Sequence, residues 1–94
     1  MPLFIIERSF ADQLDLSDEE LAVQQAYNED ANLRWLFSFL SADKKRTYCL
    51  YEAADEDALR RQAEELGLPA DSIVEVSELN PRMAFGQSAT GFLA

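Results

Sequence analysis

One stretch, residues 33–52, constrains the fold of this chain more than any other. Residues 33–40 and 47–51 are rich in aromatic and other strand-forming side chains, and a short polar break at residues 42–45 separates them. This pattern predicts a β-hairpin. Because side chains alternate along a strand, large apolar groups fall on both of its faces. A half-exposed antiparallel sheet would show water one polar face, so we expect both faces of this sheet to be covered.

The segments around the hairpin supply two helices and two further strands. Residues 3–8 and 73–76 are short apolar runs that predict the first and last strands. Ser17 starts a capping pattern for a helix over residues 18–30, and a second helix ends at Gly67. The order β-α-β-β-α-β predicts an α+β, ferredoxin-like fold, in which two helices cover one face of a four-stranded antiparallel sheet.

Each helix is expected to bury one apolar stripe against the sheet. Apolar residues that recur every three or four positions lie on the same side of a helix. The predicted inward residues are Val23, Ala26, Tyr27 and Ala31 in the first helix, and Leu59, Ala63 and Leu66 in the second.

The length of 94 residues fits one small core rather than two. We expect residues 1–78 to form the ferredoxin-like domain. Residues 79–94 have no clear period and are interrupted by Pro81, although several of them are apolar. We expect this C-terminal tail to pack on the sheet or on a partner subunit.

The charge and cysteine content exclude several classes of function. The chain has 18 acidic and 8 basic residues, a net charge of −10. This argues against nucleic acid and against an anionic membrane surface as partners. The single cysteine, Cys49, allows no internal disulfide, and no signal peptide or transmembrane pattern is visible. We therefore expect a cytoplasmic protein.

The usual signatures of catalysis are absent from the sequence. It contains no histidine, which excludes Ser-His and Cys-His pairs and histidine-bound metals. One cysteine cannot build a thiolate zinc cluster, and Gly67, Gly86 and Gly91 do not form a phosphate-binding loop. No catalytic residue is predicted.

The candidate site is expected on the face of the sheet that the helices leave open. If the helices cover Leu36, Leu40 and Leu50, the aromatic groups of the first hairpin strand lie on the opposite face. Such a face is too apolar to be left in water, and pairing two sheets in a homodimer would cover it. The residues expected to line this ligand cavity or interface are Glu7, Trp35, Phe37, Phe39, Cys49, Tyr51 and Glu75.

Five stretches carry a resemblance to a known family: residues 4–8 (FIIER), 34–39 (RWLFSF), 48–53 (YCLYEA), 55–60 (DEDALR) and 67–73 (GLPADSI). Over residues 3–78 the chain resembles a bacterial family of small domains whose best described member is a nickel-binding, nickel-responsive protein. The resemblance implies a ferredoxin-like fold, a dimer of the α+β-barrel kind, and nickel as the metal.

The chain departs from this family where metal ligands are expected. The resemblance implies a histidine and a tyrosine at the positions of Phe37 and Phe39, and a histidine in the second helix, where this chain has Arg61-Gln62-Ala63. Phenylalanine cannot coordinate a metal. The remaining oxygen donors suit a harder divalent ion, so we expect nickel binding to be weak or absent. The candidate oxygen ligands are Glu7, Glu52 and Glu75.

Three functions are compatible with these features. The first is a small binding protein, whose cavity takes a small apolar or aromatic ligand or a weakly held divalent metal. The second is a cofactor-free enzyme on a dimeric α+β barrel, of the monooxygenase or isomerase kind. The third is an interaction module whose open face serves only to dimerise.

Overall fold

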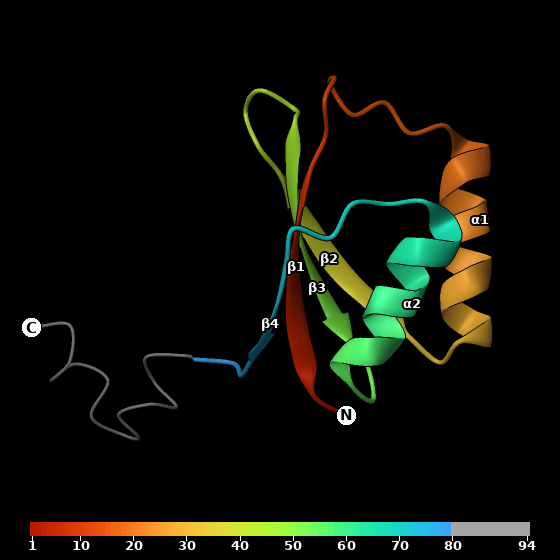
Figure 1. The fold of residues 1–94 in the computed structure, drawn as a ribbon, viewed down its shortest axis with the longest axis vertical. Helices are drawn as coiled ribbons and strands as arrows, with labels where there is room; N and C mark the ends of the chain where they lie inside the picture. Colours follow the sequence, from red (N-terminus) through yellow and green to blue (C-terminus); the bar gives the residue numbers. More distant parts are fainter. Residues whose placement is uncertain (80–94) are drawn as a thin grey trace, which may run out of the picture.

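The computed structural model describes residues 1–79 of the chain. These residues contain four strands and two helices in the predicted order (Figure 1). The elements are β1 (Leu3–Ser9), α1 (Asp18–Asp30), β2 (Arg34–Leu40), β3 (Arg46–Glu52), α2 (Glu56–Leu66) and β4 (Ser72–Val76).

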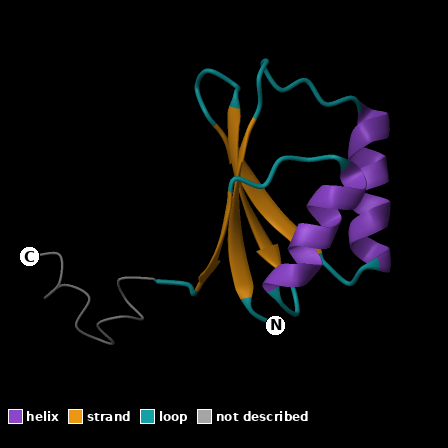
Figure 2. Cartoon of the chain, viewed as in Figure 1, coloured by secondary structure: helices purple, strands orange, loops and turns teal. Residues whose placement is uncertain are grey.

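The four strands form one antiparallel sheet in the order β2-β3-β1-β4. Both helices lie on the same side of this sheet, and its other side carries no helix (Figure 2). This arrangement is the ferredoxin-like fold that the order of elements predicts, and it is confirmed.

Local sequence signals set the ends of both helices. The Ser17 hydroxyl accepts a hydrogen bond from the backbone N–H of Glu20 at 3.1 Å, and the Asp55 carboxylate accepts one from Ala58 at 2.9 Å. Gly67 ends α2 with φ of 66°, a left-handed conformation that glycine adopts without steric cost. The predicted cap at Ser17 and the predicted helix end at Gly67 are therefore confirmed.

The first helix turns a different stripe inward from the one predicted. Val23 is 60% exposed, and Ala26 and Ala31 are also exposed. Only Tyr27 of the predicted stripe lies partly inward. The side chains that turn towards the sheet are Leu21, Gln24, Tyr27 and Asn28. The physical reason is that Asn28 is drawn inward by a polar partner in α2, described below.

A β-bulge in β2 divides the aromatic residues of the hairpin between the two faces. Trp35 pairs with Tyr51 of β3, whereas Phe37 pairs with the next residue, Leu50. Two positions of β2 are thus matched by one position of β3, and Leu36 is the extra residue. Because a bulge interrupts the alternation of side chains, Trp35 and Phe37 point to opposite sides of the sheet.

The core lies between the helices and the sheet, and it includes residues that we expected on the other side. Cys49 and Tyr51 are buried beneath the helices, together with Phe4 and Ile6 of β1. Trp35 packs against the same core. The assignment of Trp35, Cys49 and Tyr51 to the open face was therefore wrong.

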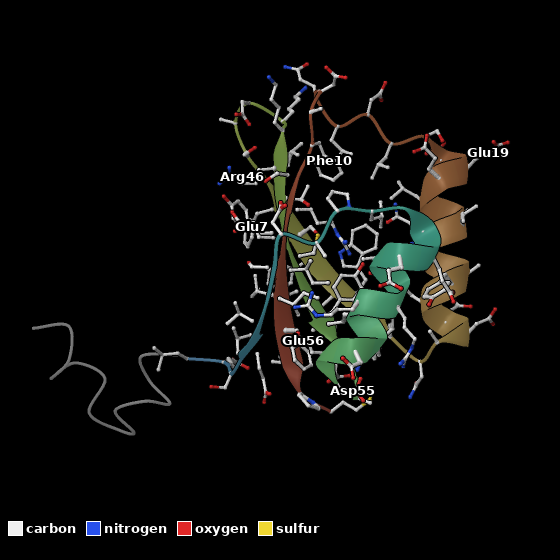
Figure 3. The ribbon with its side chains drawn as sticks, in the orientation of Figure 1. Glu7, Phe10, Glu19, Arg46, Asp55 and Glu56 are labelled. Atoms are coloured by element: carbon white, nitrogen blue, oxygen red, sulfur yellow. The ribbon has the colours of Figure 1, made fainter. Side chains whose placement is uncertain are left out.

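The side of the sheet away from the helices is called the open face here. Phe37 and Val74, which lie on it, are 50% and 52% exposed. Glu7 and Arg46 also point away from the helices (Figure 3) and form an ion pair at 3.1 Å. The apolar and aromatic residues of the open face are Leu3, Ile5, Phe37, Phe39, Tyr48, Leu50, Val74 and Val76.

The prediction that the tail packs on the sheet or on a partner concerns residues 79–94, and all of these except Leu79 lie outside the described residues. Within residues 1–79, neither helix has the length and apolar character needed to cross a membrane.

Candidate functional site

A cavity of about 170 Å³ lies on the helix side of the sheet. Its walls come from β1, β2, β3, the connection between β1 and α1, the inner side of α1, and the turn after α2. Most of the walls are apolar. The lining residues are Arg8, Phe10, Leu14, Leu16, Gln24, Trp35, Ser38, Phe39, Leu40, Thr47, Cys49, Tyr51 and Leu68.

The strands place every second side chain in this cavity. In β3, alternation directs Thr47, Cys49 and Tyr51 to the helix side. In β2, the bulge at Leu36 lets both Trp35 and Ser38 point the same way, and the Trp35 indole Nε1–H donates to the Ser38 hydroxyl at 2.7 Å. The bulge therefore builds one wall of the cavity.

The connection between β1 and α1 covers the cavity and is tied to the hairpin turn. The backbone N–H of Phe10 donates to the Lys45 carbonyl at 2.8 Å, and that of Leu14 donates to the Lys44 carbonyl at 2.7 Å. Phe10 points towards the helix side of the sheet (Figure 3). These bonds hold the connection over the sheet without a helix or strand of its own.

Two aromatic rings form the floor of the cavity. Trp35 and Tyr51 are opposite each other on neighbouring strands, with ring centroids 6.2 Å apart and planes inclined by 12°. Stacked rings with few free torsions resist rearrangement. The aromatic part of the cavity lining is therefore preformed.

A chain of buried polar side chains lies beside this floor. The Gln62 amide N–H groups donate to Asn28 Oδ1 at 2.7 Å and to the Tyr51 hydroxyl at 3.0 Å, while Gln62 Oε1 accepts from Arg8 Nη2 at 2.8 Å. Arg8 Nη1 donates to the Pro69 carbonyl at 2.6 Å. This series of hydrogen bonds joins both helices to the sheet. Within it, Gln62 is the partner that draws Asn28 inward.

Arg8 is the electrostatic centre of the site. Only 3% of its surface is exposed, and its two hydrogen-bond partners are uncharged oxygens. The ion pairs among residues 1–79 involve Arg34, Arg46 and Arg60, but not Arg8. The structure therefore holds a buried guanidinium at the cavity wall with no carboxylate beside it in the described part of the chain.

Burial also alters the chemistry of Tyr51. Loss of contact with water raises the pKa of its hydroxyl above the usual value, and the hydrogen bond from Gln62 and the positive charge of Arg8 lower it by less. The hydroxyl is therefore protonated in neutral solution. It accepts from Gln62 and retains its own proton for donation.

The structure brings together three of the predicted site residues and separates the rest. Trp35, Cys49 and Tyr51 turn into the cavity, which lies inside one copy of the chain rather than between two sheets. Phe39 borders the cavity, but its ring packs edge-to-face against Phe37, and Phe37, Phe39 and Glu7 lie on the open face. Glu75 is opposite Phe4, whose side chain is under the helices, so the expected placement of Glu75 on the open face was wrong.

The carboxylates proposed as metal ligands do not converge. Glu7 pairs with Arg46 at one end of the open face, and Glu52 pairs with Arg34 at 2.9 Å at the other end. Glu7 is opposite Tyr48, which precedes Glu52 by four residues in β3, so about 13 Å of strand separates the two carboxylates. Residues 1–79 contain no group of three or more His, Cys, Asp or Glu side chains that could hold a metal ion.

Sequence reasoning missed the polar half of the site. Arg8, Asn28 and Gln62 were not predicted, although one signal was present. Arg8 shares its strand face with Phe4 and Ile6, so a charge follows two core residues at the spacing of a strand. A charged residue at a core position is uncommon unless it has a partner or a ligand.

The fold and the cavity define a small ferredoxin-like α+β domain with a pocket between its sheet and its helices. A family model described as "Nickel responsive protein SCO4226-like" matches residues 4–76, so this chain belongs to the SCO4226-like family. The resemblance seen in the sequence motifs is confirmed.

The fold is shared with proteins of known structure. The crystal structure of SCO4226 from Streptomyces coelicolor A3(2) is similar with a TM-score of 0.68, over 83% of this chain and 99% of that chain, at 23% sequence identity. At this identity the likeness concerns the fold. No curated protein matches the chain.

The raised pKa of Tyr51 predicts a specific pH dependence of stability. Above about pH 10 the unfolded chain loses the tyrosine proton while the folded chain keeps it, so the free energy of unfolding falls as the pH rises. Tyr51→Phe should lower stability by about 1 kcal/mol at neutral pH, because Gln62 loses an acceptor. It should also flatten the alkaline decline, as measured by urea unfolding across a pH series.

Tyr27, whose pKa is also raised, is unchanged in both proteins, so the difference between the two curves isolates Tyr51. Parallel curves for the wild type and Tyr51→Phe would contradict this account of the buried hydroxyl.

Proposed function

We propose that this protein binds a small organic molecule in the cavity between its sheet and its helices. The observation that carries the proposal is the combination of an apolar cavity of about 170 Å³ with polar groups held in fixed positions at its wall. Binding sites for small molecules are typically apolar clefts with a few well-placed polar groups. This combination is the one expected of a binding protein.

The volume indicates the size of the ligand. An apolar protein cavity of about 150 Å³ holds one benzene molecule. A cavity of about 170 Å³ whose lining includes the stacked rings of Trp35 and Tyr51 therefore suits one ring with a small substituent. This is the small apolar or aromatic ligand expected from the sequence, but its site is inside each subunit.

We also propose that the open face pairs with the same face of a second copy. The exposed side chains of Phe37 and Val74 favour removal from water. Each end of the face carries one acidic and one basic residue, in the pairs Glu7–Arg46 and Arg34–Glu52. Two copies related by a twofold axis can therefore meet without facing like charges.

Nickel, which the family description names, does not fit the residues of this chain. Imidazole and thiolate are the protein ligands that bind nickel well. The sequence has no histidine, and residues 80–94 add no Cys, Asp or Glu to the described part of the chain. Cys49, the one thiol, is buried at the cavity wall.

Toluene tests the cavity directly. We expect it to raise the melting temperature of the wild type, because a ligand that binds only the folded state stabilises it. Each kcal/mol of binding should add roughly 4–8 °C for a domain of this size. Cys49→Leu extends an apolar side chain into the cavity and should reduce the shift by at least half.

Ala22→Leu is the matched control, because it adds apolar volume on the exposed side of α1 and should leave the toluene shift unchanged. No shift in the wild type, or an equal shift in Cys49→Leu, would count against binding in this cavity.

The pairing of open faces predicts a specific mass in solution. Light scattering of the purified chain should give twice 10.6 kDa, and Phe37→Arg should give a monomer. The reason is that a charge added to the paired faces would be buried without a partner. Val23→Arg, on the exposed side of α1, should remain a dimer; a monomeric wild type would refute the pairing.

Calorimetric titration with nickel chloride should show no tight, stoichiometric binding to the wild type. The reason is that the acidic side chains of the open face are separated and paired with arginines. Stoichiometric heat with a submicromolar Kd would overturn the conclusion drawn from the donor set.

A further inference from the structure

Arg8 carries a positive charge that the described protein does not neutralise. It is almost completely buried, and it donates hydrogen bonds only to the amide oxygen of Gln62 and the carbonyl of Pro69. Removing a guanidinium from water is costly, and neutral acceptors offset only part of that cost. A buried charge of this kind is normally paired with an anion.

The chain itself offers no carboxylate side chain for this pairing. The acids that form ion pairs within residues 1–79 are Glu7, Glu52 and Glu56, and each is paired with another arginine. Residues 80–94 contain no Asp or Glu. The chain has 18 acidic residues, but none of those that form ion pairs within residues 1–79 is paired with Arg8.

The position of Arg8 makes its charge available to a ligand. Arg8 lines the cavity, and each of its terminal nitrogens makes one hydrogen bond, although each carries two N–H groups. Thr47 is directly opposite Arg8 on the neighbouring strand and also lines the cavity. An anionic group here would meet the guanidinium and a hydroxyl together.

The rest of the cavity suits an apolar body. The stacked rings of Trp35 and Tyr51 line it, and Phe10 and Leu14 contribute to its cover. A carboxylate oxygen within hydrogen-bond reach of Arg8 would leave the rest of a ring over these aromatic groups. One end of the cavity is thus cationic, and the remainder is apolar.

We propose that the ligand is a small monocarboxylic acid with a single ring, whose carboxylate pairs with Arg8 and whose ring lies over Trp35 and Tyr51. This rests on the proposed function, since it names the class of molecule that the same cavity takes. Charge-assisted hydrogen bonds between guanidinium and carboxylate are about twice as strong as neutral ones. The anion therefore supplies both affinity and orientation.

The test compares three probes of similar size: benzoate, benzamide and toluene. By calorimetry, benzoate should bind the wild type at least ten-fold more tightly than benzamide, because only benzoate carries a negative charge that can pair with Arg8. Benzamide has nearly the same shape, so the ratio reports the charge and not the ring.

Two variants locate the effect at Arg8. Arg8→Met removes the charge and keeps an apolar stem of similar length, and the ratio of benzoate to benzamide affinity should fall to about one. Gln62→Glu gives Arg8 a carboxylate from α2, in place of the amide oxygen at 2.8 Å, and should reduce the ratio at least five-fold.

Arg46→Met is the matched control, because it removes the same charge from the open face. It should leave the ratio unchanged. If Arg8→Met does not fold, the ratio of benzoate to benzamide affinity in the wild type and in Gln62→Glu tests the role of Arg8.

The outcomes separate the two proposals. If toluene binds but benzoate binds no more tightly than benzamide, the carboxylate proposal is overturned and the cavity remains a binding site. An unchanged ratio in Gln62→Glu would also overturn it. If none of the three probes binds, the proposed function fails as well.

Discussion

The hydrogen bond between the buried Arg8 guanidinium and the Gln62 amide is the interaction on which the site depends. It joins β1 to α2, and the same amide reaches Asn28 of α1 and Tyr51 of β3. Most of the buried polar groups in this network are paired, although the Asn28 Nδ2 amide has no partner among the described residues. Unpairing more of them would be costly, because each unpaired group loses its hydration without compensation. The network therefore specifies how both helices sit on the sheet more strictly than apolar contacts would.

The cavity follows from the same network. The inward side of α1 carries the amides of Gln24 and Asn28 instead of a continuous apolar stripe. Asn28 is used by the network, so the N-terminal part of α1 is held over the sheet without filling the space beneath it. Leu14 and Leu16 of the preceding connection close that space only in part. A polar tie at one end of the helix thus leaves an apolar cavity at the other.

The fold could be predicted from the sequence because its signals are local. The helices begin after caps at Ser17 and Asp55, and the second one ends at Gly67. Each of these signals acts within one helical turn, so the positions of the helices in the order of elements can be read from the sequence. The faces of the sheet could not be predicted in the same way. The bulge at Leu36 reverses the alternation in β2, and nothing local distinguishes Leu36 from its neighbours. Trp35 and Tyr51 were identified as site residues, but Gln62 and Asn28 were not, since their roles depend on partners 34 positions apart.

A crystal structure of the protein with 4-bromobenzoate tests the central claim most directly, because the bromine is located by its anomalous scattering. The account predicts bromine in the cavity beside Trp35 and Tyr51, with the carboxylate about 2.8 Å from a terminal nitrogen of Arg8. Bromine found only on the open face, or a carboxylate directed away from Arg8, would contradict it.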